Sequence, residues 1–412
     1  MVHLAVGNVH ELRPGEFAGR WWWGTAASAV QAEGASLADD WYRWERAGRA
    51  PSSGNGNGFG TRFAEDFALF RELGMTDHRL SINWARVVPD EGVIDRTAVD
   101  YYRGVLAAGV AAGLRIWVCL LHSAIPAWFA DRGGFAGADA MDLWLEWVEL
   151  VATLFGDLVG GWIPFNTPSS YALKGYLTGV FPPGHGDVGE AISVLATVYR
   201  CEFEAALRLR ANGKLVYSNE ALLPLYPVGD GAAEAAARLD LLVWDSWLAL
   251  ARQPRYAGAF DLFGFTYYYG SVVTGRGELL PYPTDQEPGP LGHVRWADGI
   301  VPVLRRLHRE LPGARFVVAE VGYGGDPQAD DLGRCEYLVQ VLRHVAAAQD
   351  EGMRIEGVSL WTGVDNYEWL SGFDVPFGLI TRERTPRRSA SLVQAAILGG
   401  PVASAAREAP LR

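Results

Sequence analysis

Lysine is almost absent from this 412-residue chain. Of its 36 basic residues only Lys174 and Lys214 are lysine, so the other 34 are arginine, a bias typical of a GC-rich genome that indicates nothing about function. Acidic residues outnumber basic ones, and the formal net charge is −12. Nucleic acids and anionic membranes bind basic patches, so we expect neither as a partner.

Cysteine is also scarce: Cys119, Cys201 and Cys335 are odd in number and widely spaced, with no CxxC pair. This pattern argues against a disulfide framework and a structural zinc site, and favours reduced thiols. The chain has no run of 18 apolar residues, and Met1–Arg13 lacks the basic and apolar regions of a signal peptide. We therefore expect a soluble, cytoplasmic protein.

Short apolar segments, rich in β-branched and aromatic residues, alternate with amphipathic stretches along the whole chain. Such segments are typical of strands buried on both faces, and eight strands alternating with helices predict a closed (β/α)8 barrel of the α/β class. We expect one barrel domain over residues 1–412. The predicted strands are Trp21–Ala26, His78–Ile82, Arg115–Leu121, Gly161–Phe165, Leu215–Ser218, Leu262–Tyr268, Arg315–Ala319 and Val358–Thr362.

Helices are predicted at Arg62–Leu73, Leu143–Leu154 and Ala191–Leu209, where apolar residues recur at helical spacing. Two segments rich in Gly, Pro, Asn or Ser, Ser52–Gly60 and Gly275–Leu291, are predicted to be loops. In a barrel, loops after strands project over the carboxyl ends of the strands, where active sites form.

Polar side chains follow many of the predicted strands. A lone carboxylate at such a place is often a helix cap, but side chains from eight strand ends converge on one mouth. The residues are Gln31, Glu33, Arg79, Asn83, Arg86, His122, Asn166, Glu220, Tyr267, Tyr268, Glu320, Trp361, Asp365, Glu368 and Trp369.

The segments around these residues carry a resemblance to one family over essentially the whole chain. They occur in the family's order and read TAASAVQAEGA, HRLSINWARVVP, FNTPSSYALKGYLTGVFPPG, FGFTYYY, VVAEVG and WTGVDNYEWLSGF. The chain resembles glycoside hydrolase family 1, the β-glucosidase family. Each segment alone would be weak evidence, whereas together they are specific.

The resemblance implies a retaining mechanism on a small-molecule β-glycoside, gluco- or galacto-configured. One carboxylate attacks the anomeric carbon, and a second, about 5–5.5 Å away, acts as acid and then base. Glu320 matches the nucleophile, and Arg79 and Tyr268 match the groups that stabilise its charge. Because this chemistry uses only carboxylates, we expect no metal and no organic cofactor.

The substrate-binding positions also carry over from the resemblance. Gln31, His122 and Asn166 match residues that hydrogen-bond the sugar hydroxyls, with Asn166 at the 2-hydroxyl. Glu368 matches a carboxylate that bridges two outer hydroxyls. Trp361 matches the stacking platform, and Trp369 and Phe377 match other walls of the pocket.

The pattern breaks at the acid/base position. The family's Asn-Glu-Pro is here Asn166-Thr167-Pro168, and threonine can neither protonate a leaving oxygen nor deprotonate water near neutral pH. The family's His-Trp-Asp is His122-Ser123-Ala124, the Asn of its GxNYY segment is Thr266, and the Arg of its RFGL segment is Pro376.

Several interpretations of these departures remain open. The substrate could have an activated leaving group that departs without protonation, or Glu220, just past the fifth strand, could replace the missing acid. A longer-lived intermediate would also favour transglycosylation to a thiolate, carboxylate or phenolate acceptor in a specialised-metabolite pathway. The last interpretation is a non-catalytic, sugar-binding pseudoenzyme. The sequence does not indicate the aglycone or the oligomeric state.

Overall fold

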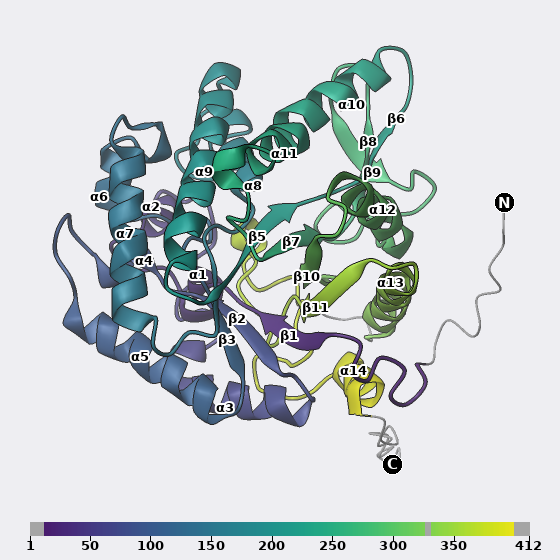
Figure 1. Cartoon of the computed structure of the whole chain (residues 1–412), viewed down its shortest axis with the longest axis horizontal. Helices are drawn as coiled ribbons and strands as arrows, with labels where there is room; N and C mark the ends of the chain where they lie inside the picture. Colours follow the sequence, from purple (N-terminus) through teal and green to yellow (C-terminus); the bar gives the residue numbers. More distant parts are fainter. Residues whose placement is uncertain (1–11, 326–330, 399–412) are drawn as a thin grey trace.

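Eight parallel strands close into a barrel in the computed structural model, which describes residues 12–325 and 331–398 (Figure 1). Around the barrel the order is β1-β11-β10-β7-β5-β4-β3-β2. The predicted (β/α)8 barrel is confirmed. Its strands are β1 (Trp22–Ala26), β2 (Asp77–Ser81), β3 (Arg115–Cys119), β4 (Gly161–Ile163), β5 (Leu215–Ala221), β7 (Leu262–Tyr267), β10 (Arg315–Val321) and β11 (Arg354–Leu360).

Helices follow the strands and surround the barrel. The three predicted helices are confirmed, with boundaries that differ by up to three residues, as α3, α7 and α9. The α-helices are α1 (Ala29–Glu33), α2 (Asp40–Arg46), α3 (Phe59–Glu72), α4 (Trp84–Val87), α5 (Arg96–Ala111), α6 (Ala127–Asp131), α7 (Ala140–Phe155), α8 (Pro168–Ala172), α9 (Val188–Arg210), α10 (Ala232–Asp240), α11 (Ser246–Ala251), α12 (Ile300–Glu310), α13 (Leu332–Asp350) and α14 (Arg388–Leu398).

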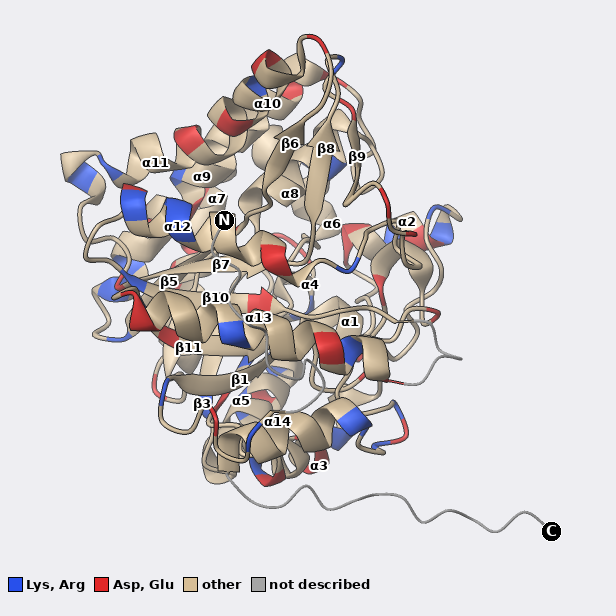
Figure 2. Ribbon diagram, turned by 90° about the vertical axis from the view of Figure 1, so that its right-hand side faces the viewer, with Lys and Arg blue, Asp and Glu red and all other residues tan. Residues whose placement is uncertain are grey.

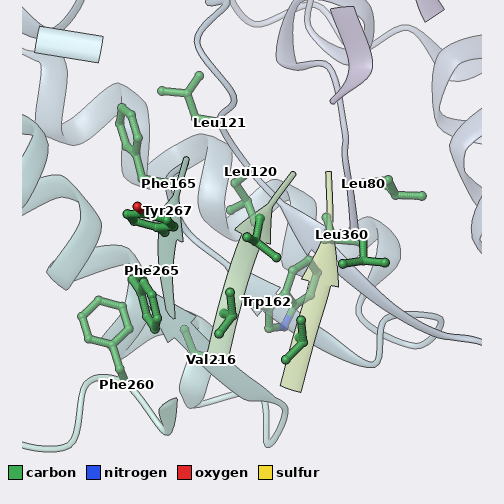
Figure 3. Close-up of a cluster of buried hydrophobic side chains, with 14 of the residues drawn as sticks. Leu80, Leu120, Leu121, Trp162, Phe165, Val216, Phe260, Phe265, Tyr267 and Leu360 are labelled. Atoms are coloured by element: carbon green, nitrogen blue, oxygen red, sulfur yellow. The ribbon is translucent and has the colours of Figure 1, made fainter. Parts of the chain in front are cut away.

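Two apolar cores lie on the two sides of the barrel wall. Figure 3 shows part of the larger one, where strand residues such as Leu80, Val216 and Phe265 face the helices. The smaller core fills the barrel itself; it consists of Trp117, Cys119, Ile163, Tyr217, Leu262, Val317 and Ala319, with Trp22 and Leu215 packed against it. Because side chains fill the interior, only the ends of the strands are left for a binding site.

A small sheet of β6 (Leu225–Pro227), β8 (Gly270–Val273) and β9 (Leu279–Tyr282) stands beside the barrel (Figure 2). It corrects the prediction that Gly275–Leu291 is loop throughout, because β9 pairs antiparallel with β8. The predicted loop Ser52–Gly60 is also two residues too long, since α3 begins at Phe59. On the face seen in Figure 2, acidic and basic residues are interspersed.

Among the described residues, no helix has the length and apolar character needed to cross a membrane.

Candidate active site

A cavity of about 250 Å³ opens at the carboxyl ends of the barrel strands. It brings together candidate residues that lie at or after the ends of six barrel strands, β1, β3, β4, β7, β10 and β11. Of the predicted catalytic and binding side chains, those that line it are Gln31, His122, Asn166, Thr167, Tyr268, Glu320, Trp361, Glu368, Trp369 and Phe377. Arg79 lies buried beneath them, 1 % exposed.

Glu320 reaches the cavity because β10 is irregular. The register of β10 against β7 shifts between Val318 and Glu320, and Glu320 pairs with Thr266. A bulge of this kind redirects a side chain; Ala319 packs inside the barrel while Glu320, the next residue, faces the cavity. The sequence segment alone carries no sign of this shift.

Two donors compensate the charge of the Glu320 carboxylate. Arg79 Nη1 lies 2.5 Å from Oε1, and the Tyr268 hydroxyl donates to Oε2 at 2.8 Å. Burial opposes a charged Arg79, but the Glu320 carboxylate raises its pKa above the ordinary value. Burial, followed by the charge of Glu320, raises the pKa of Tyr268 well above 10, so the phenol remains a donor.

Asn166 is the centre of a hydrogen-bond network beside this pair. Its Oδ1 accepts from Arg79 Nη2 and, at 2.6 Å, from Asn219 Nδ2. Asn219 Oδ1 in turn accepts from the Thr266 hydroxyl at 2.9 Å. His122 lies between Arg79 and Asn166, with Nδ1 3.3 Å from the guanidinium and Nε2 3.1 Å from Asn166 Nδ2. Burial and the Arg79 charge lower the His122 pKa well below 6.5, which keeps the ring neutral.

Gln31 and Glu368 form a second polar group in the cavity. Gln31 Nε2 donates to the Tyr367 carbonyl at 2.8 Å and to Glu368 Oε2 at 3.3 Å. Ser28, the N-cap of α1, donates to Gln31 Oε1 at 2.9 Å and thereby orients the amide. Burial raises the pKa of Glu368 to about 7.

Aromatic rings form the walls between these groups. The His122 ring stacks with Trp361 and Trp369 at centroid distances of 5.6 and 6.2 Å. Phe377 meets Tyr268 edge-on at 6.0 Å. The predicted platform and walls therefore surround the same space as the hydrogen-bonding groups.

Thr167 stands where β4 gives way to α8, and it lines the cavity. Its backbone is left-handed, with φ 44°, and its N–H donates to the Asn219 carbonyl at 2.7 Å. A β-branched residue rarely adopts this conformation, and strained residues of this kind are concentrated at functional sites. Among the described residues, its hydroxyl accepts one side-chain hydrogen bond, from Asn166 Nδ2 at 3.4 Å.

Glu220, predicted to lie at the barrel mouth, does not reach the cavity. It is the sixth residue of β5, 1 % exposed, and binds Ser169 and the Ala221 N–H. Successive strand residues point to opposite faces. Since Asn219 points inward to Asn166, Glu220 points outward beneath the helices. The expectation that its carboxylate sits at the mouth is wrong.

Other polar residues near the strand ends have structural partners. Glu33 accepts from the Tyr102 hydroxyl and lies 3.7 Å from Arg86, whereas Asn83 caps α4. Asp365 pairs with Arg387 at 2.6 Å. Tyr267 donates to a backbone carbonyl. These contacts keep the five side chains out of the cavity lining.

Sequence reasoning missed several residues of the lining: Ser170, Lys174, Phe181, Leu222, Leu223, Tyr269, His293 and Tyr323. Most belong to segments whose path over the barrel cannot be read from periodicity. Lys174 carried one signal, as one of only two lysines in the chain. In the part of the chain that the structure describes, no group of three or more His, Cys, Asp or Glu is arranged to hold a metal.

The fold and site define a barrel protein with a carboxylate-containing, aromatic-walled cavity at the carboxyl ends of its strands. The chain belongs to glycosyl hydrolase family 1: the model of that family matches residues 13–217 and 256–397.

A thermostable β-glucosidase B of Thermobispora bispora is 28 % identical, over 89 % of this chain and 88 % of its own length. A chloroplastic galactolipid galactosyltransferase of Arabidopsis thaliana is 26 % identical over 78 % of this chain and 54 % of its own length. Among solved structures, a β-glycosidase from Pyrococcus horikoshii is 28 % identical and superposes with a TM-score of 0.85, covering 94 % of this chain and 96 % of its own.

Proposed function

We propose that this protein is a retaining β-glycosidase-type enzyme that acts through a covalent glycosyl intermediate on Glu320. The observation that carries the proposal is the pair of contacts to that carboxylate, from Arg79 at 2.5 Å and Tyr268 at 2.8 Å, at the base of the cavity. A cation and a hydroxyl donor stabilise a carboxylate, and their fixed positions leave it aimed at the space where a sugar would lie.

The surrounding groups suit a monosaccharide unit. Gln31, His122, Asn166 and Glu368 bring hydrogen-bonding atoms to the lining, and Trp361 contributes an aromatic ring. Sugars are bound by such combinations of polar contacts and aromatic walls. This supports a β-glycoside of gluco or galacto configuration, with Trp369 and Phe377 as further walls.

In the first step a Glu320 oxygen attacks the anomeric carbon, and the bond to the leaving oxygen breaks with its electron pair remaining on that oxygen. In the second, an acceptor attacks the same carbon and the bonding pair returns to Glu320. Neither step requires a group that the described residues lack when the leaving group is a stable anion and the acceptor is already nucleophilic.

The restriction to anionic leaving groups and nucleophilic acceptors follows from Thr167. We infer that it occupies the acid/base position, since it follows Asn166 and lines the cavity beside Glu320's network. A hydroxyl cannot supply the proton, and general acid–base catalysis is typically worth about 10²–10⁴ in rate. Ordinary alkyl glycosides should therefore react poorly, and Glu220 cannot compensate because it faces away from the cavity.

Transfer of the sugar to an acceptor is a second candidate. Without a base to activate water the intermediate would persist, and the cavity has apolar surface for an acceptor at Leu222, Leu223 and Tyr269. The name of the Arabidopsis relative, a galactosyltransferase, is consistent with transfer chemistry on this scaffold. The third candidate function is sugar binding without catalysis.

Intact-mass measurement with an activated 2-deoxy-2-fluoro glycoside separates these candidates. Enzymatic function predicts a covalent adduct that Glu320→Gln abolishes. No adduct with either the gluco or the galacto reagent would leave sugar binding as the better hypothesis.

With a dinitrophenyl glycoside, azide should accelerate turnover, because an anionic nucleophile needs no base. A turnover rate indifferent to azide would mean that some other group performs the acid/base role.

A further inference from the structure

Lys174 is a cation in the cavity for which the proposed sugar chemistry has no use. It belongs to η2 (Leu173–Leu177), a π-helical segment that continues α8, and its side chain is exposed within the lining. Ser170 and Thr167 lie four and seven residues before it, and all three residues line the cavity. We call Thr167, Ser170 and Lys174 the helix face.

The side chain of Lys174 is part of the cavity lining, together with Thr167 and Ser170. The positive charge of Lys174 acts on the cavity, because it contributes to lowering the pKa of Glu368, of His122 and of His293, which come from different parts of the lining.

The ammonium group has no direct partner among the described residues. No ion pair within 4.0 Å and no hydrogen bond involves it there, and it lies over the Phe181 ring, with Nζ 4.9 Å from the ring centroid. Arg79, by contrast, donates hydrogen bonds to Glu320 and Asn166. Although the Lys174 side chain is accessible from the cavity, the surrounding walls desolvate its ammonium group and lower its pKa, against the opposing charges of Glu368 and Glu320. An anion in the cavity would therefore find one cation without a competing contact.

The walls near the helix face are aromatic and apolar. Tyr269 and His293 stack at 3.5 Å and present a flat surface, and Phe181 and Leu222 lie in the same lining. Burial lowers the pKa of His293 to about 4, so this ring is neutral and contributes no charge of its own. A planar apolar group fits such walls, with its charged end near Lys174.

We propose that the leaving group or acceptor is an aromatic oxyanion, an aryl carboxylate in the first instance, and that Lys174 binds its negative oxygen. This inference rests on the proposed function and deepens it. An aryl carboxylate leaves as the anion: the bond from the anomeric carbon to its oxygen breaks, the electron pair stays on the carboxylate, and no proton is needed. In the reverse direction the carboxylate attacks the intermediate and the pair returns to Glu320. Lys174 thus supplies charge where the family's acid supplied a proton.

The test compares benzoate with its neutral isostere benzamide by titration calorimetry on the whole protein. Wild type should bind benzoate about tenfold or more tightly than benzamide, the difference expected of one charge-assisted contact. Lys174→Met should remove that preference without weakening benzamide. Lys174→Arg should keep most of it, since arginine retains the charge. Lys214→Met, the matched loss of the other lysine just before β5, should change neither ligand.

Equal binding of benzoate by wild type and Lys174→Met would overturn the inference, as would an equal loss of both ligands. These outcomes do not depend on catalysis, so they are separate from failure of the 2-fluoro adduct.

Where the 2-fluoro glycosyl adduct forms, benzoate should cleave it about tenfold faster in wild type than in Lys174→Met. The reason is that the contact between benzoate and Lys174 also stabilises the transition state. Methanol should act equally on both. A similar benzoate effect on both proteins would count against Lys174.

Discussion

The network around Glu320 and the helix face lie in one cavity, yet they differ in how their polar groups are partnered. In the first, hydrogen bonds of 2.5–2.8 Å join Glu320 to Arg79 and Tyr268, and Asn166 to Asn219. In the second, the Thr167 hydroxyl has one long hydrogen bond among the described residues, of 3.4 Å, and the Lys174 ammonium forms no hydrogen bond or ion pair there.

This difference in hydrogen bonding indicates a different role for each region. Buried polar groups without hydrogen-bond partners destabilise the fold. A network in which every group has a partner is therefore rigid and preorganised. Groups left unpaired at the edge of the same cavity can be satisfied by what binds there. The network around Glu320 suits a fixed chemical step, whereas the helix face suits a ligand that brings its own charge.

The largest expected effect comes from the network. Glu320→Gln should reduce turnover of a dinitrophenyl glycoside by about 10⁴-fold or more, as removal of a nucleophile does. The amide can still accept a hydrogen bond from Tyr268, so the fold should survive. Stopped-flow or discontinuous assays of dinitrophenolate release would measure the loss, and residual activity within tenfold of wild type would contradict the assignment.

The anomeric configuration of the azide product also tests the assignment of Glu320 as the nucleophile. Wild type, with its nucleophile but no base, should yield the β-glycosyl azide by two displacements. Glu320→Gly, in which azide attacks directly, should yield the α-anomer. The same anomer from both proteins would mean that Glu320 forms no intermediate.

Thr167→Glu should convert the helix face into an acid/base site. We expect a gain of about 10²–10⁴ in hydrolysis of methyl or other alkyl glycosides, whose leaving groups need a proton. Thr167→Gln is the matched control, equal in size but unable to donate a catalytic proton. If the Glu variant gains no more than the Gln variant, the remodelling at Ser123 and Thr266 extends to the position of the sugar itself.

Removal of Arg79 should show how much the network contributes to stability. Arg79→Met leaves a buried carboxylate without its counter-ion, which typically costs about 3–5 kcal/mol, and both side chains are at most 5 % exposed. Urea unfolding followed by fluorescence would measure this. Arg43→Met, at an exposed pair with Asp131, should cost no more than about 1 kcal/mol. Similar losses for the two variants would contradict the comparison.

The sequence predicted the barrel well because strands buried on both faces produce short, uniformly apolar segments. All eight predicted strands overlap barrel strands. Many of the residues after them line one cavity, whereas Glu33, Asn83, Arg86, Glu220, Tyr267 and Asp365 do not. Lys174 could not be found this way, since its place depends on a helical segment above the barrel. β9 was missed because Pro and Gly surround exposed Leu279 and Leu280, so no apolar alternation marks the strand.

The prediction for Glu220 was wrong for a different reason, which is the position where β5 ends. Strand β5 extends to Ala221, three residues beyond its predicted end, and the pleat therefore continues through Asn219 and Glu220. Alternation turns the first toward Asn166 and the second toward Ser169. A loop at the same place would have left both side chains free to face the cavity.

The smallest expected effect follows from that orientation. Glu220→Gln should leave turnover of a dinitrophenyl glycoside unchanged, because the carboxyl binds Ser169 outside the cavity lining. Its effect should be on stability instead. Burial raises the pKa of Glu220 to about 7, from an ordinary value of 4.5.

The folded protein therefore binds more protons than the unfolded chain between these pH values, and wild-type stability falls as pH rises through 7. Glutamine does not titrate, so the variant should be the more stable protein at pH 8, and this advantage should vanish below pH 4.5. Urea unfolding at both pH values would measure the crossover. A large loss of turnover, with stability independent of pH, would instead return Glu220 to consideration as the missing acid.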